Sequence, residues 1–187
     1  TQNLAGCCFF PGDFGNGSDL FILKFSSGTM GLLNGTYVGG TGNDGINSGA
    51  MLNYNYGDVF RGEVNVDELD RPWIATVTSS TNFPMIQGPY PSYNGGTTDG
   101  VLFRMSPDLG ALEWSSYVGG SQEDAAYGVQ FTSAFEPVVC GGTRSTDYPA
   151  LGSSYQFVFG GVVDAFVTRF PNGGGTPIAS TYFGSSE

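Results

Sequence analysis

The chain repeats itself, and this repetition limits its fold more than any other feature of the sequence. Three segments share an Asp followed by a run of mainly apolar residues: Asp19 to Phe25, Asp99 to Met105 and Asp164 to Phe170. Three more read Ser/Thr-Tyr-Val/Phe-Gly-Gly/Ser: Thr36 to Gly40, Ser116 to Gly120 and Thr181 to Ser185. In both patterns the second copy follows the first by 80 residues and the third follows the second by 65. Matching offsets in two patterns indicate structurally equivalent units.

A third pattern shows where the extra residues of the first, 80-residue period lie. Thr78 to Pro84 reads Thr-Ser-Ser-Thr-Asn-Phe-Pro, and Thr143 to Pro149 repeats it 65 residues on. Gly40 lies 38 residues before Thr78, whereas Gly120 lies 23 residues before Thr143. The 15 extra residues therefore fall between the first two units, and we assign them to an insertion at residues 41–61.

Each unit contains four candidate strands. In the final unit these are residues 127–132, 138–142, 164–170 and 178–183, with short turns at residues 133–137 and 171–175. Short turns join antiparallel neighbours, and 31 Gly with 10 Pro supply many turns and disfavour helix. A period containing four short strands predicts an all-β chain, a segment of a β-propeller with four-stranded antiparallel blades.

The three patterns together resemble those of SBBP repeats, and the resemblance covers nearly the whole chain. It implies a β-propeller related in plan to NHL propellers. Such propellers occur in large secreted or surface-attached bacterial proteins, including gliding-motility and other cargo of Bacteroidota type IX secretion. The implied function is that of a non-enzymatic scaffold or adhesion and binding module, outside the cell or on its surface.

The phasing of NHL propellers divides the chain into blades. It predicts an incomplete blade at residues 1–40, where Leu4 to Gly40 lacks the inner strand, and complete blades at 58–120 and 121–187. It also makes the strand through residues 129–131 innermost. Closed propellers need four to eight blades, so we expect an open arc whose two ends each present an apolar face. The expected end residues are Phe21, Leu23 and Phe25 at one end, and Val129, Val139, Phe166 and Tyr182 at the other.

Charge and cysteine content restrict partners and cofactors. A net charge of −11 disfavours nucleic acid, and no apolar run approaches the roughly 20 residues that cross a bilayer. With no His and three Cys, we expect no zinc site and no cofactor. Cys140 is expected to be a buried free thiol in an apolar strand, and a disulfide to Cys7 or Cys8 is the alternative.

Aromatic residues in the long loops are the candidate binding residues. The loops at 84–96 and 149–161 and the insertion hold Tyr54, Tyr56, Tyr90, Tyr93 and Tyr155, with Phe157 and Phe159 beside them. Tyr packs well on protein surfaces and on sugar rings, so the expected partner is a protein or the remaining blades, with a glycan as the alternative. The competing interpretation is that these aromatics fold back and seal the crevices between blades.

Acidic residues at repeated positions have a structural and a chemical interpretation. Asp44 and Asp124 are expected to cap turns rather than to bind calcium, which needs six to eight oxygen ligands. Asp19, Asp99 and Asp164 are expected to cap the crossovers into the strands that they open. Glu63, Asp67, Glu68 and Asp70 offer carboxylate pairs for a carbohydrate-processing propeller, the alternative function. Any acidic chain offers such pairs, so we expect no catalytic residues.

Overall fold

The structure, a computed structural model, describes residues 17–53 and 59–186, and this part of the chain is all-β without α-helix. The first sheet is the hairpin β1 (Leu20–Phe25) and β2 (Leu32–Val38). The middle sheet contains β3 (Glu63–Val66), β4 (Pro72–Thr78), β5 (Asp99–Met105) and β6 (Leu112–Val118) in chain order. The last sheet contains β7 (Asp124–Phe131), β8 (Pro137–Thr143), β9 (Asp164–Arg169) and β10 (Ala179–Phe183), also in chain order.

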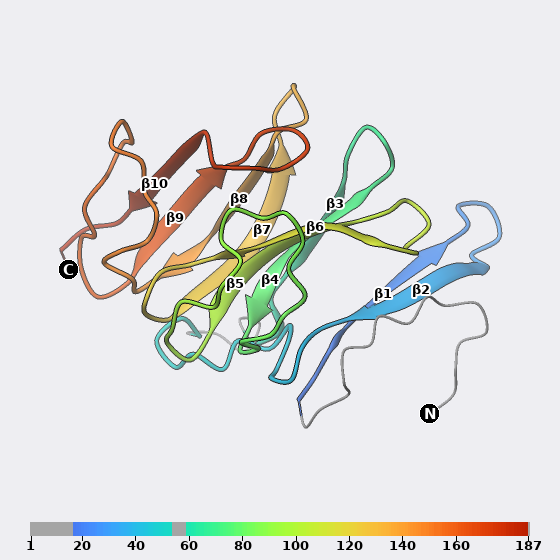
Figure 1. The fold of residues 1–187 in the computed structure, drawn as a ribbon, viewed down its shortest axis with the longest axis horizontal. Coiled ribbons are helices and arrows are strands. Elements are labelled where there is room, and N and C mark those ends of the chain that lie inside the picture. The colour runs from blue at the N-terminus through green and yellow to red at the C-terminus, as the bar shows by residue number, and fades with distance from the viewer. Residues whose placement is uncertain (1–16, 54–58, 187) are drawn as a thin grey trace.

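These sheets confirm the coarse prediction. All neighbouring strands are antiparallel, two sheets have four strands, and the array does not close into a ring (Figure 1). The strand register also repeats: Val64 pairs with Ile74 in the middle sheet, as Val129 pairs with Val139 in the last. The 65-residue period of the sequence is therefore a period of strand pairing.

The middle sheet is covered on both faces. Because side chains alternate along a strand, Trp73, Leu102 and Trp114 point to one face, where they share a core with Phe166 and Tyr182 of the last sheet. Val101, Phe103 and Tyr117 point to the other face and pack with Val38, Leu20 and Ile22 of the first sheet. Each sheet therefore buries its apolar side chains against the next sheet rather than within itself.

The prediction of which residues form the exposed end face of the last sheet is wrong. Val129, Val139, Phe166 and Tyr182 are all at most 1% exposed, because they face the middle sheet. The side chains at the alternate positions form the outer face, which we define by Cys140, Val167 and Phe183. At the other end the prediction is closer: Phe21 and Phe25 are exposed, and Leu23 is half-buried.

The predicted burial of Cys140 is wrong for the same reason. Its thiol is exposed and is not in a disulfide, because β8 presents it on the outer face, opposite to Val139. Its counterpart one unit earlier, Ala75, is completely buried under the last sheet. Cys7 and Cys8, the alternative disulfide partners, lie outside the described residues, as does the start of the predicted incomplete blade.

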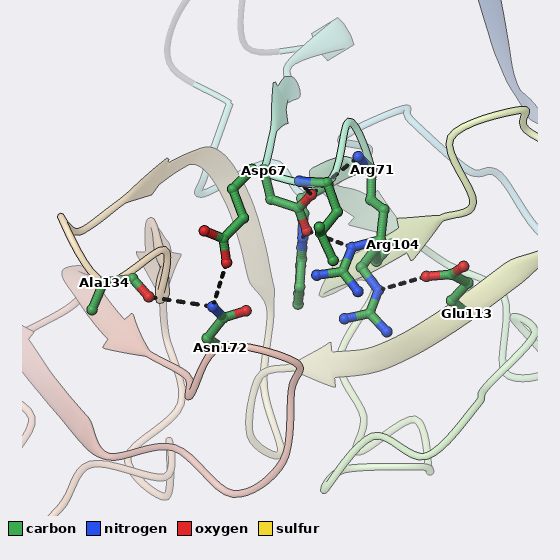
Figure 2. A network of polar contacts seen from close by, with 9 residues as sticks. Asp67, Arg71, Arg104, Glu113, Ala134 and Asn172 are labelled. Atoms are coloured by element: carbon green, nitrogen blue, oxygen red, sulfur yellow. Dashed lines mark hydrogen bonds and ion pairs between the residues drawn. The ribbon is translucent and has the colours of Figure 1, made fainter.

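The turns at one end of the sheets are tied together by polar contacts (Figure 2). Asp67, in the turn between β3 and β4, accepts hydrogen bonds from Arg71 Nε at 2.7 Å and from Trp73 Nε1 at 3.0 Å. Asn172 Nδ2 donates to Glu68 Oε1 and to the Ala134 carbonyl, both at 3.3 Å. The second set joins a turn of the middle sheet to two turns of the last sheet, so it restricts sliding between them.

Candidate functional site

The Tyr-Val-Gly-Gly pattern and the pattern that contains Ser145 meet between the middle and last sheets. Asp124 Oδ2 accepts hydrogen bonds from the Gly120 amide and from Ser145 Oγ, both at 2.7 Å. The hydroxyl of Tyr182 donates to the Ser145 carbonyl at 2.8 Å. Asp147 Oδ1 accepts from the Ser121 amide at 2.8 Å. Residues of both patterns therefore take part in the contacts of this junction.

The junction between the first and middle sheets has the same contacts. Asp44 Oδ2 accepts from the Gly40 amide at 2.8 Å and from Ser80 Oγ at 2.9 Å, and Thr78 also donates to this carboxylate. Tyr117 donates to the Ser80 carbonyl at 2.7 Å. These bonds confirm that Asp44 and Asp124 cap turns.

Two of the three aspartates that open the third strand of a unit, Asp99 and Asp164, also act as caps. Asp99 Oδ2 accepts from the Asn94 amide at 2.8 Å, and Asp164 Oδ2 accepts from the Gly160 amide at 2.6 Å. Both bonds close the loop that leads into the strand, as predicted. Both side chains are buried, and no described residue donates to the Oδ1 of either.

Burial changes the acidity of these carboxyl groups. Desolvation, with the nearby Asp124 as a further cause, raises the pKa of Asp99 to about 8. Desolvation also raises the pKa of Asp124 to about 6, although Thr143, Ser145 and Gly120 donate to it and oppose the shift. A neutral Asp99 at physiological pH removes the repulsion between two buried charges.

A metal ion has few ligands here. Among the described residues, no three His, Cys, Asp or Glu side chains come together as a metal site would require. We interpret the paired aspartates as parts of the junctions between sheets.

The predicted aromatic binding residues divide into two groups. Tyr90 and Tyr93 are half-buried against the core of the middle sheet, and Tyr93 packs edge-on against Tyr117 with ring centroids 5.8 Å apart. Tyr155 is 84% exposed and stacks on Phe183, also at 5.8 Å. Tyr54 and Tyr56 lie outside the described residues.

The two phenylalanines beside Tyr155 also differ. Phe157 is 56% exposed, whereas Phe159 packs edge-on against Tyr182 at 5.8 Å. The structure therefore does not bring the predicted aromatics into one surface. Tyr155 forms an exposed aromatic pair with Phe183.

The acidic residues considered for glycoside hydrolysis form other contacts. Glu63 accepts from the Val129 amide at 3.0 Å and from Gln130 Nε2 at 2.8 Å, which joins the middle sheet to β7. Asp67 is held by Arg71 and Trp73 as described above. Glu68 accepts from Asn172. Each of these three carboxylates thus has a structural partner.

The described residues form an apolar groove. It has a volume of about 830 Å³ and lies between β1 and the face of β3 and β4. All six residues of β1 line it, together with Val64, Val66 and Ile74. The sequence patterns did not reveal this groove, because it depends on how the first and middle sheets meet.

The fold and these sites define an all-β chain of repeated antiparallel sheets in an open array. No protein-family model matches the chain, and no curated protein is significantly similar to it. Among the described residues, no helix is long and apolar enough to cross a membrane.

Proposed function

We propose that this chain is a β-propeller segment of SBBP-like repeats that serves as a non-enzymatic scaffold or adhesion and binding module of a secreted or surface-attached bacterial protein. One observation carries the proposal: the exposed apolar faces at both ends of the array are counterparts of faces buried inside it. The partners are further blades of the same kind or another protein.

The outer face of the last sheet supports this comparison. Val167 is 39% exposed and Phe183 is 63% exposed. Their counterparts 65 residues earlier, Leu102 and Val118, are at most 1% exposed, because the last sheet covers them. The outer face of the last sheet is therefore equivalent to one that an additional sheet would cover.

The first sheet shows the same relationship with the opposite face. Phe21 is 61% exposed and Phe25 is 47% exposed. Their counterparts 80 residues later, Val101 and Met105, are completely buried under the first sheet. Contiguous apolar side chains on a surface mark interaction sites, so both ends of the array are suited to contact a further sheet.

Both end faces are apolar, and each is the counterpart of one side of a buried junction. One chain can therefore pack on the end of another in the position of the next blade. We expect the chain to associate with itself in analytical ultracentrifugation, with a sedimentation coefficient that rises with concentration. Val167→Asp should abolish this association, because it introduces a charge on the outer face. Val158→Asp is the matched control, because Val158 is 72% exposed in a loop. A wild-type chain that stays monomeric at all concentrations would contradict the proposal.

A glycan is the second candidate partner, and the aromatic pair favours it. Tyr155 and Phe183 are both exposed, with an interplanar angle of 30°. Exposed aromatic faces stack on sugar rings. Binding to a glycan array that is lost in Tyr155→Ala and kept in Tyr90→Ala would support this function. Binding that is unchanged in Tyr155→Ala would exclude this pair as the glycan site.

A further inference from the structure

The backbone of β7 directs hydrogen-bonding groups away from its own sheet at Val129. In an antiparallel pair, alternate residues direct their N–H and C=O groups toward the partner strand. Thr132 does so, because its amide donates to the Glu136 carbonyl at 3.1 Å. Val129, three residues earlier and paired with Val139 in unbroken register, therefore directs its N–H and C=O groups to the other side. In the described part of the chain, this side is an edge of the last sheet, because β7 is its end strand.

Two side chains of β3 bind these backbone groups. Glu63 Oε2 accepts from the Val129 amide at 3.0 Å, and Asn65 Nδ2 donates to the Val129 carbonyl at 3.4 Å. In a sheet, the carbonyl and amide groups of a neighbouring strand would make the corresponding bonds. The two side chains therefore occupy the hydrogen-bonding positions of an added strand.

The side chain of Gln130 completes this arrangement. Asn65 Nδ2 also donates to Gln130 Oε1 at 3.0 Å, and Gln130 Nε2 donates to Glu63 Oε1 at 2.8 Å. The four hydrogen bonds form a closed ring that includes the backbone of Val129. Gly128 leaves room for it, because a Cβ on Gly128 would lie 2.8 Å from Glu63 Oε2. The position of the Glu63 carboxylate is thus fixed from both sides.

We propose that Glu63 and Asn65 block the edge of β7, so that a strand from a second copy of this chain cannot pair with it. Backbone groups at the edge of a sheet are a template for strands of other molecules, and charged side chains are a common means of protecting them. This inference is independent of the proposed function. That function concerns association through the apolar faces of the end sheets, whereas the blocked contact would run along the edge of a strand.

Removal of both side chains tests the proposal. In Glu63→Ala/Asn65→Ala, we expect the Val129 amide to exchange with deuterium at least roughly tenfold faster in NMR spectra. We also expect assemblies that bind thioflavin T and persist on dilution, as paired strands do. Association through the apolar end faces would instead reverse on dilution. The matched control is Glu136→Ala/Asn172→Ala, which removes the same two residue types from turns and should show neither effect.

Gly128→Ala tests the same contact without removing a polar side chain, because the added Cβ would displace the Glu63 carboxylate. Circular dichroism shows which variants are folded. The proposal is overturned if exchange of the Val129 amide is unchanged in the folded variants. It is also overturned if exchange becomes faster and no assemblies that bind thioflavin T form. If neither variant folded, the contacts would be required for folding, which would equally overturn a role confined to the edge.

Discussion

Asp99 and Asp124, which come from adjacent sheets, close over the same glycine: Asp99 Oδ1 and Asp124 Oδ2 lie 2.7 and 2.8 Å from where a Cβ on Gly119 would be. This arrangement explains why the Asp and Tyr-Val-Gly-Gly patterns recur with one spacing. The Gly leaves room for two carboxyl groups, and the carboxyl groups bind the loops on either side. The junction therefore uses residues of both patterns.

We expect the stability of the chain to fall as the pH rises from about 4 to about 8. The pKa of Asp99 is raised from 3.8 to about 8 in the folded chain, and that of Asp124 to about 6. The folded chain therefore holds more protons than the unfolded chain in this range, and the free energy of unfolding decreases with pH. Asp99→Asn should flatten the decrease by about 2 to 5 kcal/mol.

Urea unfolding at pH 5 and pH 8.5 measures this effect. Asp108→Asn is the control, because hydrogen bonds from Ser106 and Gly110 lower the pKa of Asp108, so it stays ionised throughout this range. An equal pH dependence in the wild type and Asp99→Asn would show that Asp99 ionises normally.

Gly120→Val should destabilise the fold by about 1 to 3 kcal/mol. The cause is close packing, because a Cβ on Gly120 would lie 2.6 Å from both Asp147 Oδ1 and Ser145 Cβ. Gly152→Val, with nothing within 4 Å of its added Cβ, should change stability much less. Thermal unfolding compares the two variants, and equal melting temperatures would refute the packing argument.

Tyr182→Phe should destabilise the fold by about 1 to 2 kcal/mol, because it leaves the buried Ser145 carbonyl without the Tyr182 donor. The exposed Tyr155 provides the control, since Tyr155→Phe removes a hydroxyl that contributes little to folding. Chemical denaturation with both variants separates loss of the hydrogen bond from loss of a hydroxyl. Equal midpoints would show that the bond adds no net stability.

Asp67→Asn should cost about 1 to 3 kcal/mol at pH 7. Burial alone would raise the pKa of Asp67, but hydrogen bonds from Trp73, Arg71 and Leu69 hold it below its ordinary value. The stability from this carboxylate is present above pH 4 and is lost as the pH falls through the folded pKa. The difference from wild type should therefore shrink in acid, as denaturation at pH 7 and pH 3 would reveal. Glu68→Gln, on an exposed residue of the same turn, is the control for removal of a charge.

The sequence predicted the strands well because their turns and alternation are local properties. The four strands expected between residues 127 and 183 agree with β7 to β10 to within a few residues at each end. The register also follows the period, as the pairs of Val64 with Ile74 and Val129 with Val139 show.

It was harder to predict which face of each sheet is buried. Alternation along a strand separates the side chains of the two faces, but it does not indicate which face the neighbouring sheet covers. Val139 and Cys140 are adjacent in β8, yet the first is buried and the second is exposed. Similarly, composition alone could not distinguish Tyr93, which packs on Tyr117, from Tyr155, which is exposed. Contacts between distant segments decide both cases.

The equivalence of the two junctions has a consequence for growth of the array. Each additional sheet would cover one apolar face and expose another of the same kind, so a row of any length keeps two uncovered faces. In a longer row, the free-energy cost of the two exposed apolar faces is smaller per residue, but it is never removed. Only a ring, or a differently built unit at each end, brings the number of uncovered faces to zero.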